Sequence, residues 1–134
     1  MSSTETPTIY VVDDDADVLG SLRFLLETDG FEVHAFGSGA ALLKALDQAV
    51  VDCFVLDYRM PDVNGIDLAA DLRKRGVTAP VVLISGDFDD GLEARAAAAG
   101  VRDFLVKPLL DDNLAKRIRK AIADGHLASS GERP

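Results

Sequence analysis

Short runs of β-branched and other apolar residues alternate along the chain with longer segments in which apolar residues recur three or four positions apart. The short runs fit buried strands, and the longer segments fit amphipathic helices. Because the two patterns alternate from one end to the other, they predict an α/β fold. The predicted strands cover residues 9–12, 33–36, 53–56, 81–84 and 104–106.

A helix is predicted after each strand. Residues 92–99 are rich in alanine and show little apolar periodicity, so they are predicted to be helical from propensity alone. Three glycines fall where helices should end, namely Gly30, Gly76 and Gly100. The apolar residues expected on buried helix faces are Val18, Leu22, Leu25, Leu26, Leu42, Leu43, Leu46, Leu68, Leu72, Leu114, Ile118 and Ile122.

The order of these elements predicts a doubly wound, five-stranded parallel sheet with helices on both faces, because crossovers between parallel strands are almost always right-handed. We expect the flavodoxin-like strand order 2-1-3-4-5. One domain is predicted over residues 9–124. The polar ends, residues 1–8 and 125–134, are predicted to be flexible.

The composition narrows the classes of function. The chain has 134 residues and a formal net charge of −9. An acidic surface disfavours direct binding of nucleic acid by this chain, because phosphate backbones are bound by clustered cations. No apolar run is long enough to cross a bilayer, and residues 1–7 lack the features of a signal peptide, so we expect no membrane contact and a cytoplasmic location. The lone Cys53 lies in an apolar run and is expected in the core.

The residues that could carry chemistry stand at the carboxyl ends of the predicted strands. Asp13 and Asp14 follow the first strand, Asp57 follows the third, Ser85 the fourth and Lys107 the fifth. Ligands of open α/β sheets bind beyond these ends, so we expect the five side chains to converge. Grouped carboxylates repel one another unless a cation neutralises them, and an all-oxygen site suits Mg²⁺.

Such a pocket also suits phosphoryl chemistry. A carboxylate can attack a phosphoryl group and form an acyl phosphate, provided that a metal and a cation offset the charge on the transferring oxygens. Lys107 can pair with one phosphoryl oxygen as a compact cation, and the hydroxyl of Ser85 can donate to another.

Simpler explanations exist for several of these residues. For Asp15 we favour a helix N-cap over a functional role. Ser85 alone could be a turn residue and Lys107 alone a solvated charge, but their joint placement with the acids favours function. For Phe104 two interpretations stay open: a static aromatic residue and a side chain that moves.

Four segments carry a family resemblance: VVDDD at residues 11–15, VLDYRMPDVNG at 55–65, LISG at 83–86 and DFLVKP at 103–108. In this order they resemble the signature segments of the receiver family of response regulators, and the resemblance runs from about residue 9 to residue 123. The first segment and residues 31–39 are most similar to nitrogen-fixation-type regulators, which join a receiver to a DNA-binding helix-turn-helix domain. This chain departs from that pattern by ending at Pro134.

The resemblance implies a role for each residue of the pocket. Asp57 would accept the phosphoryl group, and Lys107 would pair with it. Asp14 and Asp57 would bind Mg²⁺ directly, Asp13 would contribute through water, and the backbone carbonyl of Arg59 would complete the protein ligands.

The resemblance also implies a conformational switch. Ser85 would reorient toward the phosphoryl group, and Phe104 would change rotamer as an output face shifts. Arg59 and Asp87 would lie across the pocket mouth and control the access of water. The Lys107–Pro108 peptide would be cis.

Three classes of function are compatible with these residues. The first is a signalling switch, a regulatory domain of a two-component system that takes a phosphoryl group onto Asp57 from a histidine kinase or a phosphotransfer protein. The second is an aspartate-nucleophile phosphatase or phosphotransferase, and the lack of a sizeable insertion to form a substrate cap counts against it. The third is a constitutive docking module, and the complete set of pocket residues counts against it.

Phosphorylation is also expected to promote formation of a homodimer through the fourth helix, fifth strand and fifth helix. Charges of both signs are available there for a two-fold interface, although they could equally form a solvated surface. These residues are Glu93, Arg95, Arg102, Asp103, Lys116, Arg117, Arg119 and Lys120.

Overall fold

The structure of the chain is a computed structural model that describes residues 6–46, 50–60, 62–86, 90–107 and 113–131. Its five strands form one parallel sheet in the order β2-β1-β3-β4-β5, which confirms the predicted fold class and strand order. Each predicted strand is present and at most one residue longer at either end. The strands are β1 (Thr8–Val12), β2 (Glu32–Phe36), β3 (Cys53–Asp57), β4 (Val81–Ser85) and β5 (Asp103–Val106).

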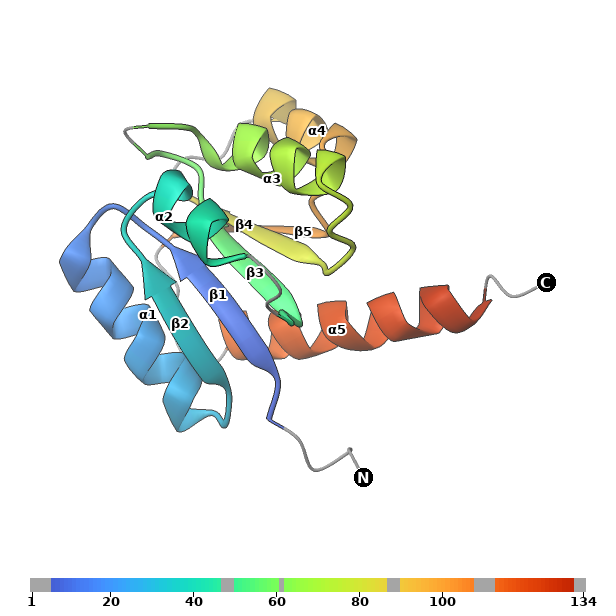
Figure 1. Ribbon diagram of the computed structural model, residues 1–134, viewed down its shortest axis with the longest axis horizontal. Helices are drawn as coiled ribbons and strands as arrows, with labels where there is room; N and C mark the ends of the chain where they lie inside the picture. The colour runs from blue at the N-terminus through green and yellow to red at the C-terminus, as the bar shows by residue number, and fades with distance from the viewer. Residues whose placement is uncertain (1–5, 47–49, 61, 87–89, 108–112, 132–134) are drawn as a thin grey trace.

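The described residues form five helices, which cover both faces of the sheet (Figure 1). The helices α1 and α5 lie on one face, and α2, α3 and α4 lie on the other. None of the helices in this part of the chain is long and apolar enough to span a membrane. The helices are α1 (Ala16–Thr28), α2 (Gly39–Ala45), α3 (Gly65–Lys74), α4 (Asp90–Ala98) and α5 (Asn113–Gly131).

Local sequence determines where several of these helices begin and end. Short polar side chains cap the first turns of α1, α2 and α3 by accepting hydrogen bonds from free backbone N–H groups. The caps are Asp15, Ser38 and Asn64. The residues predicted to end helices, Gly30, Gly76 and Gly100, have positive φ angles of 98°, 86° and 93°, which a residue with a Cβ rarely adopts.

Successive strand residues point to opposite faces, so the sheet separates two apolar cores. In the first core, strand residues such as Val11 and Val55 pack against Leu22 and Leu26 of α1 and Ile118 of α5. In the second core, strand residues that include Val12, Leu56 and Leu83 pack against α2, α3 and α4. Cys53 is fully buried in the first core, as predicted, and burial raises the pKa of its thiol to about 12.

One helix-face prediction is wrong. Leu25 was expected on the buried face of α1, but it is 43% exposed. Leu22 and Leu26 are four positions apart and share the line of contact with the sheet, whereas Leu25 lies beside that line with Phe24, which is 69% exposed. In α4, where periodicity gave no prediction, Leu92 and Ala96 are buried at this same spacing.

Helix α5 is tied to the turn between α1 and β2 by Arg119. The guanidinium of Arg119 lies 4.5 Å from the ring centroid of Phe31 and donates a hydrogen bond to the carbonyl of Asp29. The helix continues to Gly131, past residue 124 where the sequence analysis ended the domain, and its last part runs beyond the sheet (Figure 1).

Arg73, in the last turn of α3, ties that helix to the loops that lead into β4 and β5. Its guanidinium donates to three backbone carbonyls, those of Val77 at 2.9 Å, Ala79 at 2.7 Å and Gly100 at 2.9 Å. A Cβ on Gly100 would lie 2.8 Å from Nε of Arg73, so a side chain there would displace that of Arg73, in addition to the strain of the positive φ. Burial, and secondarily Arg102, lowers the pKa of Arg73.

We therefore predict that Gly100→Ala is more destabilising than Gly76→Ala. Both glycines have positive φ, but a Cβ on Gly76 meets nothing within 4 Å, so Gly76→Ala isolates the backbone cost of about 1–2 kcal/mol. Gly100→Ala should add the loss of hydrogen bonds from Arg73, for a total of about 2–4 kcal/mol. Urea unfolding of the two variants measures this difference, and equal losses of stability would contradict it.

Candidate functional site

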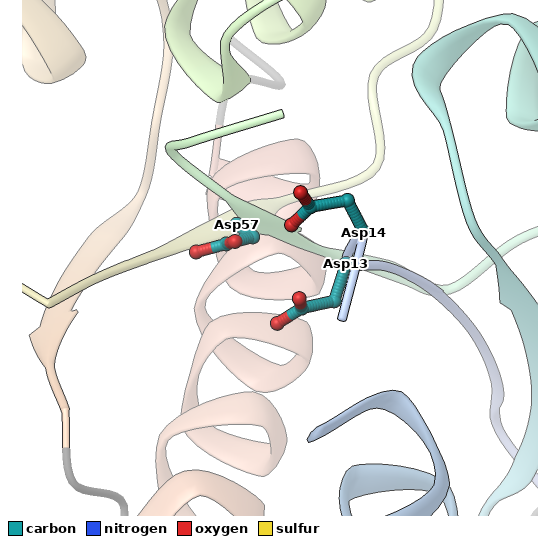
Figure 2. A group of neighbouring side chains, drawn as sticks. All are labelled: Asp13, Asp14 and Asp57. Carbon is teal, nitrogen blue, oxygen red and sulfur yellow. The ribbon is translucent and has the colours of Figure 1, made fainter. Parts of the chain in front are cut away.

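The register of the sheet brings three aspartates together at its carboxyl edge. Strands β1 and β3 are neighbours, with Val12 opposite Leu56, so the residues that follow lie side by side. Figure 2 shows the carboxylates of Asp13 and Asp14 grouped with that of Asp57. One carboxylate oxygen from each lies within 4.8 Å of the others, so the predicted convergence of the acids is present.

The acids differ in their exposure to solvent. Asp13 and Asp57 are buried, with 1% and 5% of their surface exposed, and Asp14 is exposed. The Asp13 carboxylate accepts a hydrogen bond from the backbone N–H of Asp15 at 2.9 Å, which fixes its orientation. Asp15 turns away and caps α1 through the N–H groups of Asp17 and Val18, as predicted for it.

Lys107 places its ammonium group between the two buried carboxylates. Its Nζ lies 3.3 Å from an oxygen of Asp57 and 3.5 Å from an oxygen of Asp13. Its backbone N–H donates to the carbonyl of Ser85 at 2.8 Å, which continues the β4–β5 ladder and aims the side chain at the pocket. Burial alone would lower the pKa of Lys107, but attraction to Asp57 and Asp13 outweighs it and leaves the pKa raised.

The electrostatics of the site fit a bound divalent cation. Burial, followed by repulsion from Asp13, raises the pKa of Asp57 despite the nearby Lys107. A single ammonium thus leaves the carboxylate charges incompletely balanced. The donor atoms are carboxylate oxygens, which hard cations such as Mg²⁺ prefer, so Asp13, Asp14 and Asp57 could together hold this ion.

Two further predicted residues border the pocket or lie on the strand beside it. Ser85 is buried at the end of β4, where it stands opposite Val106 of β5. Phe104 is half-buried and packs against the second core, on the same face of the sheet as α3 and α4. Their positions are compatible with the predicted switch.

The structure describes only some of the remaining predicted residues. Arg59 is described and its side chain is exposed. Asp87, predicted as its partner at the pocket mouth, and Pro108, predicted to follow a cis peptide, lie outside the described residues.

Sequence reasoning missed the contacts that hold the loop after Asp57. Asp62 accepts hydrogen bonds from the N–H groups of Ala40 at 3.0 Å and Gly39 at 3.4 Å, and these bonds lower the pKa of its carboxyl. A Cβ on Gly65 would lie 2.6 Å from the carbonyl oxygen of Asp57. The loop is therefore held between α2 and α3, and a clue was available in the Asp-x-x-Gly spacing that follows the buried aspartate.

Comparisons with known proteins agree with this geometry. Residues 9–119 match the family described as "Response regulator receiver domain". The transcriptional regulatory protein FixJ of Bradyrhizobium diazoefficiens is 39% identical over 124 residues, which are 92% of this chain and 60% of FixJ. The chain spans about half the length of other curated relatives it matches, such as TmoT of Ectopseudomonas mendocina.

Solved structures give the same result. Full-length FixJ from B. japonicum superposes with a TM-score of 0.86 at 38% identity, covering 95% of this chain and 63% of FixJ. TrrA from Thermotoga maritima, in complex with Mg(2+)-BeF, superposes with a TM-score of 0.77 at 25% identity, covering 87% of this chain and 99% of TrrA. With its fold, its acidic pocket and this match over most of its length, the chain belongs to the response regulator receiver domain family, the regulatory phosphoacceptors of two-component signalling.

Proposed function

We propose that Asp57 accepts the phosphoryl group and that Mg²⁺ is held by Asp13, Asp14, Asp57 and the backbone carbonyl of Arg59. The observation that carries this proposal is the position of Asp57, a buried carboxylate within 4.8 Å of two others and 3.3 Å from the ammonium of Lys107. TrrA, a relative of the same fold, was solved in complex with Mg(2+)-BeF, which supports the choice of metal.

The residues of the pocket have distinct tasks in the transfer. An oxygen of Asp57 attacks phosphorus, the bond from phosphorus to the donor's histidine nitrogen breaks, and the electron pair leaves with the imidazole. When bound, Mg²⁺ neutralises charge on the phosphoryl oxygens. Lys107 moves from the carboxylates to a phosphoryl oxygen, and the hydroxyl of Ser85 donates to another.

The contacts of the phosphoryl group with these residues would also operate the conformational switch that was predicted from the sequence. Ser85 ends β4 and Phe104 lies on the neighbouring strand β5, so a shift of Ser85 toward Asp57 changes the packing beside Phe104. Arg59 lies at the pocket mouth and slows the access of water to the phosphoryl group. Asp87, its expected partner, and the cytoplasmic location remain predictions from the sequence.

The phosphodonor is proposed to dock on α1. Receiver domains take their phosphoryl groups from histidine kinases, so the donor must contact elements that surround the pocket. Helix α1 begins directly after the acidic residues, and its outer face exposes Phe24 at 69% and Leu25 at 43%. Ala16 and Gly20 leave a shallow hollow beside these side chains, which suits an apolar side chain of a partner helix.

The proposed homodimer uses α4, β5 and α5. Two of the charges expected at this interface are already paired within the chain, since Arg117 donates to both carboxylate oxygens of Asp103 at 2.7 Å. A self-complementary interface would therefore depend on other charges, including the exposed Arg102. FixJ is named a transcriptional regulatory protein, and a transcriptional output for this chain would act through a partner or a further domain.

The first prediction from this proposal concerns the acceptor. A small phosphodonor with Mg²⁺ should add one phosphoryl group to the protein, and Asp57→Asn should abolish the adduct, as measured by intact mass spectrometry. Asp67→Asn removes an exposed carboxylate from the first turn of α3 and should leave the adduct unchanged. Asp14→Ala should weaken Mg²⁺ binding at least ten-fold, because water replaces a carboxylate ligand.

Two results would overturn this assignment: an undiminished adduct in Asp57→Asn, or an adduct that forms equally well in chelator.

The same samples, followed over time, give the lifetime of the phosphoryl group. Arg59→Ala should shorten it with little change in stability, since an exposed charge contributes only about 0–1 kcal/mol.

The second prediction concerns donor docking. Phe24→Ser should slow phosphotransfer from a histidine kinase by about ten-fold or more, because exposed aromatics are typical interface anchors. Phosphorylation by a small phosphodonor should be unchanged, since that reagent needs no docking surface. Val50→Ser is the matched control, because Val50 is 81% exposed but precedes β3 at the opposite edge of the sheet. Equal rates for Phe24→Ser and wild type with the kinase would exclude this surface.

The third prediction concerns the oligomeric state. Sedimentation velocity over a range of concentrations should show a monomer without a phosphodonor and a dimer with it. Arg102→Glu should weaken the dimer by introducing a like charge among the acids of the interface. A monomer under both conditions would remove self-association and leave a different protein as the reader of the switch.

A further inference from the structure

Helix α4 has a limited apolar attachment to the sheet. Among its described side chains only Leu92 and Ala96 are buried, whereas α3 buries Ile66, Leu68, Ala69 and Leu72. The position of α4 therefore depends more on its polar contacts than that of α3 does. One such contact joins α4 to the residue next to the phosphoacceptor: the Arg95 guanidinium donates a hydrogen bond to the hydroxyl of Tyr58 at 3.4 Å.

Tyr58 is well placed to transmit a change at Asp57. Its backbone N–H donates to the carbonyl of Ile84 at 2.8 Å, and its carbonyl accepts from the N–H of Gly65 at 2.9 Å, so its backbone is held between β4 and α3. Its partly buried side chain packs against the second core, to which α4 contributes its apolar residues. A displacement at the end of β3 therefore reaches α4 through one side chain.

We propose that Tyr58 is a positioning residue that couples the phosphoacceptor strand to α4 through its hydrogen bond with Arg95. The proposal rests on the function proposed above for Asp57. Phe104, the aromatic residue of β5, has no hydroxyl and can influence α4 only by packing. Tyr58 adds a directional polar contact to this packing.

The expected size of the effect follows from the nature of the bond. Tyr58→Phe keeps the ring and its packing and removes only the hydroxyl. The substitution therefore disfavours the observed position of α4 relative to positions in which the side chains of Tyr58 and Arg95 are apart. One partly exposed hydrogen bond should shift such an equilibrium by about two- to ten-fold.

Hydrogen exchange measures how often the amides of α4 open to solvent, and therefore how firmly the helix is held. The amides of α4 should exchange about two- to ten-fold faster in Tyr58→Phe than in wild type, and those of α3 should not change. Tyr10→Phe is a matched control, because the Tyr10 hydroxyl also donates one hydrogen bond of 3.4 Å, to the carbonyl of Ala45, far from α4 in the sheet.

The rate of phosphorylation by a small phosphodonor tests whether this contact reaches the acceptor. Tyr58→Phe and Arg95→Met should change the rate by a similar factor of about two to ten, and the double variant should change it no further, since both remove one interaction. Tyr10→Phe should have the wild-type rate. A contact that only stabilised the fold would leave the phosphorylation rate unchanged in all of these variants.

The outcomes separate this proposal from the one on which it rests. If wild type is phosphorylated but the variants have wild-type rates, or if the two single effects add in the double variant, the coupling role of Tyr58 is overturned. If wild type takes up no phosphoryl group, the function proposed for Asp57 fails, and this proposal fails with it.

Discussion

The charge balance between the grouped aspartates and Lys107 is the constraint around which the structure is organised. Two of the acids are buried, and burial, followed by repulsion from Asp13, raises the pKa of Asp57 despite the nearby lysine. Such an arrangement is unfavourable for folding, and it persists because apolar packing on both faces of the sheet holds the backbone that carries it. The incompletely balanced negative charge also suits the pocket to a divalent cation such as Mg²⁺.

The sheet provides this geometry through register. Because β1 lies beside β3, the residues after Val12 and Leu56 are forced together, whatever the loops do. Lys107 follows β5, two strands away from β3. The hydrogen bond from its backbone N–H to the carbonyl of Ser85 brings the ammonium group of Lys107 to the same edge. The precision of the site therefore comes from backbone ladders, which are rigid, and the loops supply only local orientation, as Asp62 and Gly65 do for the segment after Asp57.

Sequence patterns predict those features of the fold that depend on apolar periodicity and on local backbone chemistry. The strands, the glycine helix ends and the cap at Asp15 were predicted correctly, because each has a local cause. The convergence of the aspartates was predictable once the strand order was assumed. Leu25 was misassigned because a helical pattern fixes which residues are neighbours but not how wide a face the sheet will cover.

Several of the contacts that escaped prediction belong to long polar side chains. Arg73 reaches three carbonyls on two loops, Arg119 reaches the turn after α1, and Arg95 reaches Tyr58. None of these contacts leaves a periodic pattern in the sequence, because each depends on which distant residue a long, flexible side chain reaches in the folded structure. These contacts add polar attachments to α3, α4 and α5 beyond the apolar faces of the three helices.

The unequal attachment of α3 and α4 would allow a single phosphoryl group to operate the switch proposed above. Reversing a two-state population from 1:99 to 99:1 requires about 5.5 kcal/mol, and a charge-assisted hydrogen bond contributes about 1.5–3 kcal/mol. The contacts proposed for a phosphoryl group with Lys107 and Ser85 would therefore be of the same order as the polar contact and the two buried side chains that hold α4. They are small against the larger apolar face of α3, which is also anchored by Arg73. A change at Asp57 should accordingly displace α4 while α3 and the rest of the second core stay in place.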